Sequence, residues 1–241
     1  MTGVRGARGV HIAAVDDDIR ERLATLPWDR PLAQWDGVQF GSLGLSRHTV
    51  RAVECGQAEA LAETLIIKET DEGRAGDEYR LLCSLRDAGQ PAVRPLGVVT
   101  GRTTPTAGAL ITQRLTPAAR YDEILRDGPR STAAHSVVDA FAGLLARLHQ
   151  AGFFWGDAAL SNTLFSPGQA GYTAWLVDAE TGELHPRLSD GQTAHDLQLA
   201  RLNMAGELYA STSTAAEADA AAVRALDSRL AETYRSLVGQ G

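Results

Sequence analysis

The chain has 241 residues, of which 44% are apolar and 22% are charged, and its formal net charge is -7 with a pI near 5.4. This composition is typical of a globular chain that forms one domain or two small lobes sharing a cleft. The acidic balance argues against nucleic-acid binding, because phosphate contacts require a basic surface.

The two cysteines, Cys55 and Cys83, have no metal-ligand spacing and indicate reduced thiols. No apolar run approaches the roughly 20 residues that span a bilayer. The weakly apolar run Val10–Val15 is followed directly by three aspartates, a pattern that does not fit a secretory signal. We therefore expect a cytoplasmic protein without a membrane segment.

Residues 1–36 are predicted to form an N-terminal extension. Residues 1–12 are rich in glycine and arginine and have no periodic pattern of apolar residues, which indicates a loose arm. A short helix should begin at Asp16–Asp18, whose charges suit a helix N-terminus, and end at Pro27. Its apolar stripe consists of Ile19, Leu23 and Leu26. Trp28 and Trp35 follow, and buried packing against a lobe is favoured over a partner-binding role.

Residues 37–115 indicate a small antiparallel sheet crossed by one helix. Its first hairpin is predicted to join Val38–Phe40 to Thr49–Val53 through a glycine-containing turn. The glycines allow backbone N–H groups to approach an anion closely, and polar side chains near the tip supply further donors. An ordinary hairpin turn is the competing interpretation. The residues that the phosphate-binding interpretation uses are Gly41, Gly44, Ser46 and Arg47.

The next segments are predicted to place a lysine opposite a carboxylate. Leu65–Lys68 is typical of a buried strand, and Glu78 borders the apolar stripe of a helix that ends at Gly89. A core-facing carboxylate requires a partner, and Lys68 is the natural candidate. Other carboxylates compete for this role and are expected at the surface: Glu69, Glu72 and Asp77.

Two further strands, 93–99 and 109–114, should complete the sheet and lead to a hinge at Leu115–Pro117. Residues 116–241 then indicate a mainly helical lobe. A short helix is expected at 121–126 and a long one at 131–150. The buried stripe of the long helix is predicted to contain Val137, Val138, Phe141, Leu144, Leu145 and Leu148.

Three acceptor side chains lie near predicted strand ends in the segment 144–180. Asp157 and Asn162 form a G-D-x-x-x-x-N spacing, and Asp178 closes an apolar strand that we expect beside them. Phosphoryl transfer requires two oxygen ligands for magnesium and one group to orient the attacking hydroxyl. This set of residues therefore favours a kinase.

The remaining segments indicate two more helices, one starting near His195–Asp196 and one over 215–238. Asp196 is expected either to cap its own helix or to bind the backbone of the Asp157 loop. A metal role for His149, His185 or His195 is disfavoured, because no second histidine cluster has ligand spacing.

The pattern Leu148-His149-x-x-Gly152-x-x-x-Gly156-Asp157-x-x-x-x-Asn162 resembles the catalytic loop of the protein-kinase-like superfamily, and Val177–Glu180 resembles its metal-binding D-F-G segment. Trp155-Gly156-Asp157 stands in place of H-R-D and is similar to the H-G-D of small-molecule phosphotransferases. The missing arginine argues against regulation by activation-loop phosphorylation. The whole chain resembles an actinobacterial kinase-like family labelled lipopolysaccharide-kinase-like. The stretches that carry this likeness are LPWDRPLAQW, GLSRHTVR, GFFWGDAALSNTLF and VDAETGELHPRLSDGQ.

This resemblance implies an α+β, two-lobed protein-kinase-like fold that uses ATP and Mg²⁺. It assigns Asp157 to catalysis, Asn162 and Asp178 to the metal, and Lys68, paired with Glu78, to the nucleotide phosphates. The residues that it places at the nucleotide are Gly41, Gly44, Ser46, Arg47, Lys68 and the backbone at Gln113 and Leu115. It implies that the backbone groups near Gln113 to Leu115 are free to hydrogen-bond an adenine edge.

The acceptor stays open among small-molecule, sugar, lipid and protein hydroxyls. A nucleotide-binding pseudokinase is an alternative, because the glycine loop is weak and D-F-G is altered. Transfer of AMP instead of phosphate is another. A glycosidase with Asp157 and Asp178 as its carboxylates is disfavoured, because it leaves Asn162 and Lys68 without roles.

Overall fold

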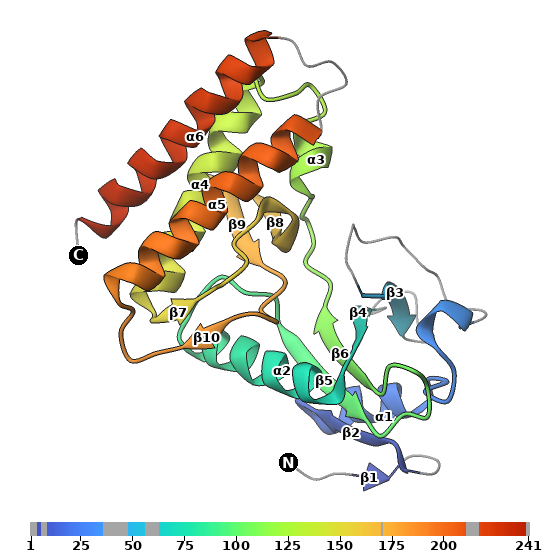
Figure 1. Ribbon diagram of the computed structural model, residues 1–241. Coiled ribbons are helices and arrows are strands. Elements are labelled where there is room, and N and C mark those ends of the chain that lie inside the picture. Colours follow the sequence, from blue (N-terminus) through green and yellow to red (C-terminus); the bar gives the residue numbers. More distant parts are fainter. Residues whose placement is uncertain are drawn as a thin grey trace. The chain divides into compact units, whose positions relative to one another are not determined.

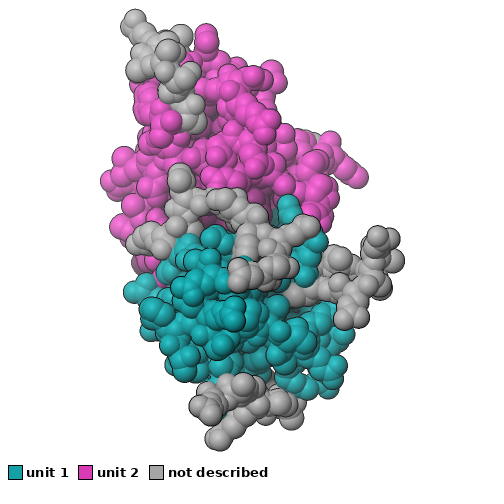
Figure 2. Space-filling view, turned by 90° about the vertical axis from the view of Figure 1, so that its right-hand side faces the viewer, with its two compact units in different colours: residues 1–84, 93–115 teal, residues 85–92, 116–241 magenta. Residues whose placement is uncertain are grey.

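The computed structural model describes residues 4–5, 9–35, 48–55, 63–169, 171–210 and 217–239. The chain divides into two compact units, which Figure 2 colours separately. The first comprises residues 1–84 and 93–115 and is called the sheet unit here. The second comprises residues 85–92 and 116–241 and is called the helical unit.

The sheet unit contains a six-stranded antiparallel sheet with the strand order β1-β2-β5-β6-β4-β3 (Figure 1). The strands are β1 (Val4–Arg5), β2 (His11–Ala14), β3 (Val50–Cys55), β4 (Glu63–Thr70), β5 (Pro95–Thr100) and β6 (Gly108–Gln113). The helical segments that begin in this unit are α1 (Asp17–Ala24), the short 3-10 turn η2 (Leu32–Gln34) and α2 (Glu72–Asp87). The predicted antiparallel sheet with one crossing helix is therefore present.

The N-terminal residues differ from the expected loose arm, because β1 and β2 extend the sheet. β2 pairs with β5 from His11 opposite Thr100 to Ala14 opposite Gly97, and the N–H of Val15 donates to the carbonyl of Leu96 at 2.9 Å. An edge strand has unpaired backbone groups, and β2 satisfies those of β5. A four-residue strand has too little periodic pattern to be recognised from sequence.

The segment after β2 packs as predicted. Asp16 caps α1 by accepting a hydrogen bond from the N–H of Ile19 at 2.8 Å. Trp28 and Trp35 are 5% and 2% exposed, and their rings meet edge to face with centroids 5.1 Å apart. They join the core formed by the odd-numbered β4 residues Leu65 and Ile67. The expectation that both tryptophans are buried is confirmed.

Glu69 was expected at the surface and is instead 4% exposed. It follows Leu65 and Ile67 in the alternating pattern of β4, so it lies on the face that the N-terminal segment covers. Its Oε1 accepts hydrogen bonds from the N–H of Leu32 at 2.7 Å and from Arg102 at 2.6 Å. A charged residue is tolerated inside a protein when it is paired in this way, which the local sequence pattern does not reveal.

The helical unit is built around α4, which packs against α6 and the β8–β9 hairpin (Figure 1). Its elements are α3 (Tyr121–Ile124), α4 (Thr132–Gln150), β7 (Phe153–Phe154), the 3-10 turn η3 (Leu160–Asn162), β8 (Thr163–Gly168), β9 (Gly171–Leu176), β10 (Glu183–Leu184), α5 (Asp190–Ala210) and α6 (Glu217–Val238). All six residues of the predicted α4 stripe are buried. Within the described ranges, no helix is long and apolar enough to cross a bilayer.

Helix α5 begins at Asp190, earlier than the expected start near His195. The N–H of Ser189 donates to the side-chain oxygen of Gln192 at 3.0 Å, and the N–H of Gln192 donates to the Ser189 hydroxyl at 3.3 Å. This reciprocal pair is a capping box, which Ser189-x-x-Gln192 encodes. Asp196 therefore lies inside the helix and does not cap it.

Candidate active site

Lys68 and Glu78 form a buried ion pair within the sheet unit. Lys68 lies on the even-numbered face of β4, and its Nζ is 2.7 Å from Oε2 of Glu78 on α2. The Lys68 side chain is 10% exposed and that of Glu78 is 0% exposed. The partner that the sequence predicted for Lys68 is the one found, whereas Glu69 turns to the opposite face of the strand.

The residues expected around the phosphates and the adenine can be placed only in part. Gly41, Gly44, Ser46 and Arg47 lie outside the described residues, as does the strand predicted at 38–40. Gln113 is the last residue of β6, and Leu115 lies two residues after it. Both are partly buried.

The backbone at Gln113 is not as free as expected. The N–H of Gln113 donates to the carbonyl of Arg94 at 2.9 Å, and the N–H of Arg114 donates to the carbonyl of Thr64 at 3.1 Å. The expectation of free backbone groups is wrong for these two donors, because the sheet ladder continues to this point.

Asp157 and Asn162 contact each other in the helical unit. The Asn162 Nδ2 donates to the backbone carbonyl of Asp157 at 3.0 Å and to its carboxylate at 3.2 Å. Both side chains are half-buried. Because the amide nitrogen is directed to Asp157, the oxygen Oδ1 is the atom that Asn162 can offer to a metal.

Asp178 lies two residues after β9, beside the same loop. The N–H of Val177 donates to the backbone carbonyl of Asn162 at 3.2 Å, and the indole of Trp155 donates to the carbonyl of Asp178 at 3.3 Å. The carboxylate of Asp178 accepts the N–H of Glu180 at 3.0 Å, which fixes the turn that follows. The structure thus brings together the segments that carry Asp157, Asn162 and Asp178.

Gly156 is required by the backbone geometry of this loop. Its φ of +75° lies in the left-handed region, and a Cβ at this position would be 3.0 Å from the carbonyl oxygen of Thr181. An L-residue with a side chain would be strained in this conformation. Local geometry therefore explains why glycine precedes Asp157.

Helix α5 binds the backbone of the loop through three polar side chains. The Asp196 carboxylate accepts the N–H groups of Trp155 at 2.6 Å and Gly156 at 2.8 Å. Asn203 and Glu207, which no sequence motif predicted, also bind this loop. They appear in the sequence as polar positions seven and eleven residues after Asp196, and this spacing was the available signal.

A buried histidine completes the support of Asp196. His149 lies between the Tyr234 hydroxyl, 2.7 Å from Nδ1, and the Asp196 carboxylate, 3.1 Å from Nε2. Burial, followed by the charge of Asp196, raises the pKa of Tyr234 and keeps its hydroxyl protonated. Because a carboxylate only accepts, we assign Nε2–H as the donor to Asp196 and the Tyr234 hydroxyl as the donor to Nδ1.

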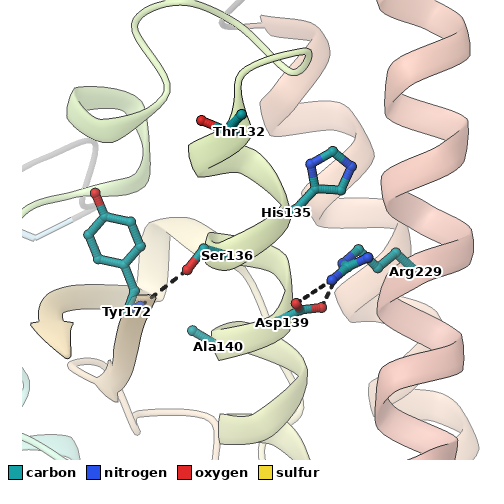
Figure 3. A pocket seen from close by; sticks show the side chains of 7 residues that line it. All are labelled: Thr132, His135, Ser136, Asp139, Ala140, Tyr172 and Arg229. Carbon is teal, nitrogen blue, oxygen red and sulfur yellow. Dashed lines mark hydrogen bonds and ion pairs between the residues drawn. The ribbon is translucent and has the colours of Figure 1, made fainter. Parts of the chain in front are cut away.

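A separate open pocket of about 400 Å³ lies on α4, the β8–β9 hairpin and α6 (Figure 3). The Arg229 guanidinium binds both carboxylate oxygens of Asp139, at 2.7 and 2.6 Å, and the N–H of Tyr172 donates to the Ser136 hydroxyl at 3.2 Å. The charged groups of this pocket thus bind each other and join α4 to α6. None of the predicted site residues is among the described residues that line it.

The model of the "Lipopolysaccharide kinase (Kdo/WaaP) family" matches residues 47–226. The chain belongs to this family. Membership makes it a kinase-like phosphotransferase and implies an ATP-dependent activity with nucleotide and acceptor substrates. No curated protein matches the chain.

Two solved structures resemble this Kdo/WaaP family member. One is a glucosamine kinase with a TM-score of 0.53 and 15% identity, covering 95% of this chain and 71% of the other. The second is WaaP in complex with acyl carrier protein, with a TM-score of 0.48 and 16% identity, covering 95% of this chain and 93% of the other. The likeness to the glucosamine kinase shows a shared fold alone. The predicted α+β protein-kinase-like fold is confirmed.

Proposed function

We propose that this chain transfers the γ-phosphoryl group of ATP to a hydroxyl acceptor in a magnesium-dependent reaction. The observation that carries the proposal is that Asn162 contacts both of the other segments. Its side chain donates to Asp157, and its backbone carbonyl accepts the N–H of Val177, the residue before Asp178. In this proposal Asp157 orients the acceptor hydroxyl and accepts its proton, and Lys68, held by Glu78, binds the nucleotide phosphates.

The side chains near this loop suit a magnesium ion. Asn162 and Asp178 are the residues that we expect to hold it, one through an amide oxygen and the other through a carboxylate. Mg²⁺ prefers oxygen ligands and takes its remaining ligands from phosphates and water. When bound, it neutralises charge that develops on the phosphates during transfer.

The remaining nucleotide contacts are part of the same proposal. We place residues 37–115 at the nucleotide, residues 116–241 at the metal and acceptor, and residues 1–36 as an extension. Within the first of these, Gly41, Gly44, Ser46 and Arg47 would bind phosphate. The backbone near Gln113 and Leu115 would bind adenine, apart from the N–H groups of Gln113 and Arg114 that the sheet uses. Because ATP is the proposed donor, we also propose a cytoplasmic location.

Calorimetry of ATP binding with Mg²⁺ and with EDTA tests the proposal. We expect ATP affinity to fall at least tenfold in EDTA, because part of the binding free energy depends on the metal. Equal affinity under both conditions would mean that Asn162 and Asp178 do not hold a metal.

A labelled-ATP assay on fractionated cell extract separates the alternatives. Label transferred from the γ-position supports phosphoryl transfer, and label from the α-position supports AMP transfer. Metal-dependent ATP binding without transfer to any fraction would favour the pseudokinase.

A further inference from the structure

The three side chains that bind the loop share one face of α5. At about 100° per residue, Asn203 and Glu207 lie within about 20° of Asp196 around the helix axis. Their apolar neighbours Ala200 and Met204 are buried. The packing of α5 through these apolar residues therefore does not depend on Asn203 or Glu207.

Glu207 binds the start of the η3 turn. Its Oε2 accepts the N–H of Leu160 and its Oε1 accepts the N–H of Ser161, both at 2.9 Å. The first N–H groups of a helical turn have no partner within the turn, and a carboxylate satisfies two of them with one oxygen each. Asn162 is the next residue after Ser161, so this contact fixes the backbone from which its side chain extends.

Asn203 binds the other part of the loop. Its Nδ2 donates to the carbonyl of Ala158 at 3.0 Å. Since Asp196 holds the N–H of Gly156, Asp157 has a backbone contact to α5 on each side. Asp157 and Asn162 thus each lie next in sequence to a residue whose backbone is bound by a side chain of α5.

We propose that Asn203 and Glu207 are positioning residues that hold Asp157 and Asn162 in register for metal binding and hydroxyl orientation. The inference rests on the proposed function. A displacement of about 1 Å in a catalytic group costs about 10²-fold in rate, so loss of these contacts should affect chemistry even when the fold is retained. The charge of Glu207 also contributes, after burial, to raising the pKa of the nearby Tyr121 to about 12.

Glu207→Gln is the principal test in the full-length chain. It keeps the side-chain shape but replaces one acceptor oxygen with an NH₂ group, which then faces a backbone N–H that needs an acceptor. Glu232→Gln is the matched control, because it removes an exposed carboxylate from α6 in the same unit. The readouts are kcat for ATP hydrolysis, the free Mg²⁺ concentration that gives half-maximal rate, and amide hydrogen exchange at Leu160 and Ser161.

We expect Glu207→Gln to lower kcat about 10- to 100-fold and to raise the Mg²⁺ requirement about tenfold, with faster exchange at both amides. Glu232→Gln should match the wild type. Faster exchange with kcat and Mg²⁺ requirement within twofold of wild type would reduce Glu207 to a structural role and overturn the proposal.

Asn203→Asp supplies a second test that keeps the proposal falsifiable if Glu207→Gln does not fold. It replaces a donor facing the Ala158 carbonyl with an acceptor, and we expect the same direction of change in kcat. Unchanged kcat in a folded Asn203→Asp protein contradicts the role of Asn203. Failure of the wild type to bind or hydrolyse ATP with Mg²⁺ would instead overturn the proposed function itself, and the positioning role with it.

Discussion

The Nζ of Lys68 and the Oε2 of Glu78 form an ion pair of 2.7 Å that joins β4 to α2, with side chains 10% and 0% exposed. Surface ion pairs contribute only about 0 to 1 kcal/mol, but removing one partner of a buried pair leaves a buried charge and costs about 3–5 kcal/mol. This pair is therefore expected to influence both stability and the position of the ammonium group.

Glu78→Gln should lower ATP turnover by more than tenfold. The amide keeps the shape and can still accept a hydrogen bond from Lys68, so the loss of stability should be smaller than the about 3–5 kcal/mol of a wholly unpaired charge. The ammonium is nevertheless no longer held by an opposite charge. Turnover and thermal melting measured on the same preparation check this expectation. A loss of turnover below tenfold with unaltered melting would assign the pair no role in positioning phosphate.

Asp157→Asn should separate nucleotide binding from chemistry. Asparagine has the same size and can still accept the Asn162 hydrogen bond, but it cannot accept the hydroxyl proton. We expect ATP to bind with near wild-type affinity while transfer falls about 10²-fold or more. Calorimetry and an ATP hydrolysis or autophosphorylation assay in one buffer make the comparison, and full turnover would show that the assignment of Asp157 is wrong.

Asp178→Asn provides the contrasting result. If Asp178 holds the metal, weakening this ligand should lower metal-dependent ATP affinity as well as turnover. The measurement is the difference in ATP affinity between Mg²⁺ and EDTA. A variant that keeps the whole metal dependence would remove Asp178 from the metal site.

Arg102→Met should destabilise the sheet unit by about 3–5 kcal/mol, because it leaves the Glu69 carboxylate buried without its cation. Arg102 also donates to the carbonyls of Trp28 and Arg30, at 3.2 and 2.8 Å, so the change should loosen the N-terminal segment. Urea denaturation monitored by tryptophan fluorescence measures the shift.

The double variant Glu69→Gln/Arg102→Met serves as the control for this mechanism. Glutamine removes the buried charge and can still accept the Leu32 N–H, so at least half of the lost stability should return. No recovery would mean that packing of the arginine and its hydrogen bonds to the Trp28 and Arg30 carbonyls, and not its charge, stabilise this region.

Two buried tyrosines should make the protein less stable at high pH. Burial is the main cause that raises the pKa of Tyr79 and of Tyr121 from 10.0 to about 12. Because the folded state keeps these phenols protonated, their contribution to stability is complete below pH 10 and is lost as the pH rises from about 10 to 12. Tyr79→Phe and Tyr121→Phe should each flatten the loss of stability over this window, measured by denaturation at a series of pH values.

The sequence by itself determined the elements that have a strong period or a specific local signal. The apolar stripe of α4, the strand that carries Lys68, the capped α1 and the order of Asp157, Asn162 and Asp178 are visible in it because side-chain spacing and backbone preference act over a few residues. The Ser189-x-x-Gln192 box belongs to the same class, although the helix that it caps was expected to start near His195.

Only the tertiary structure decided which partner each buried polar group takes. Glu69 looked like a surface charge until η2 and Arg102 covered its face, and β2 forms because β5 offers an unpaired edge. Asn203 and Glu207 are ordinary polar residues of a helix until the Trp155–Asn162 loop folds onto them. Contacts between residues 33 to 47 positions apart depend on how the elements pack, and local pattern carries no record of that packing.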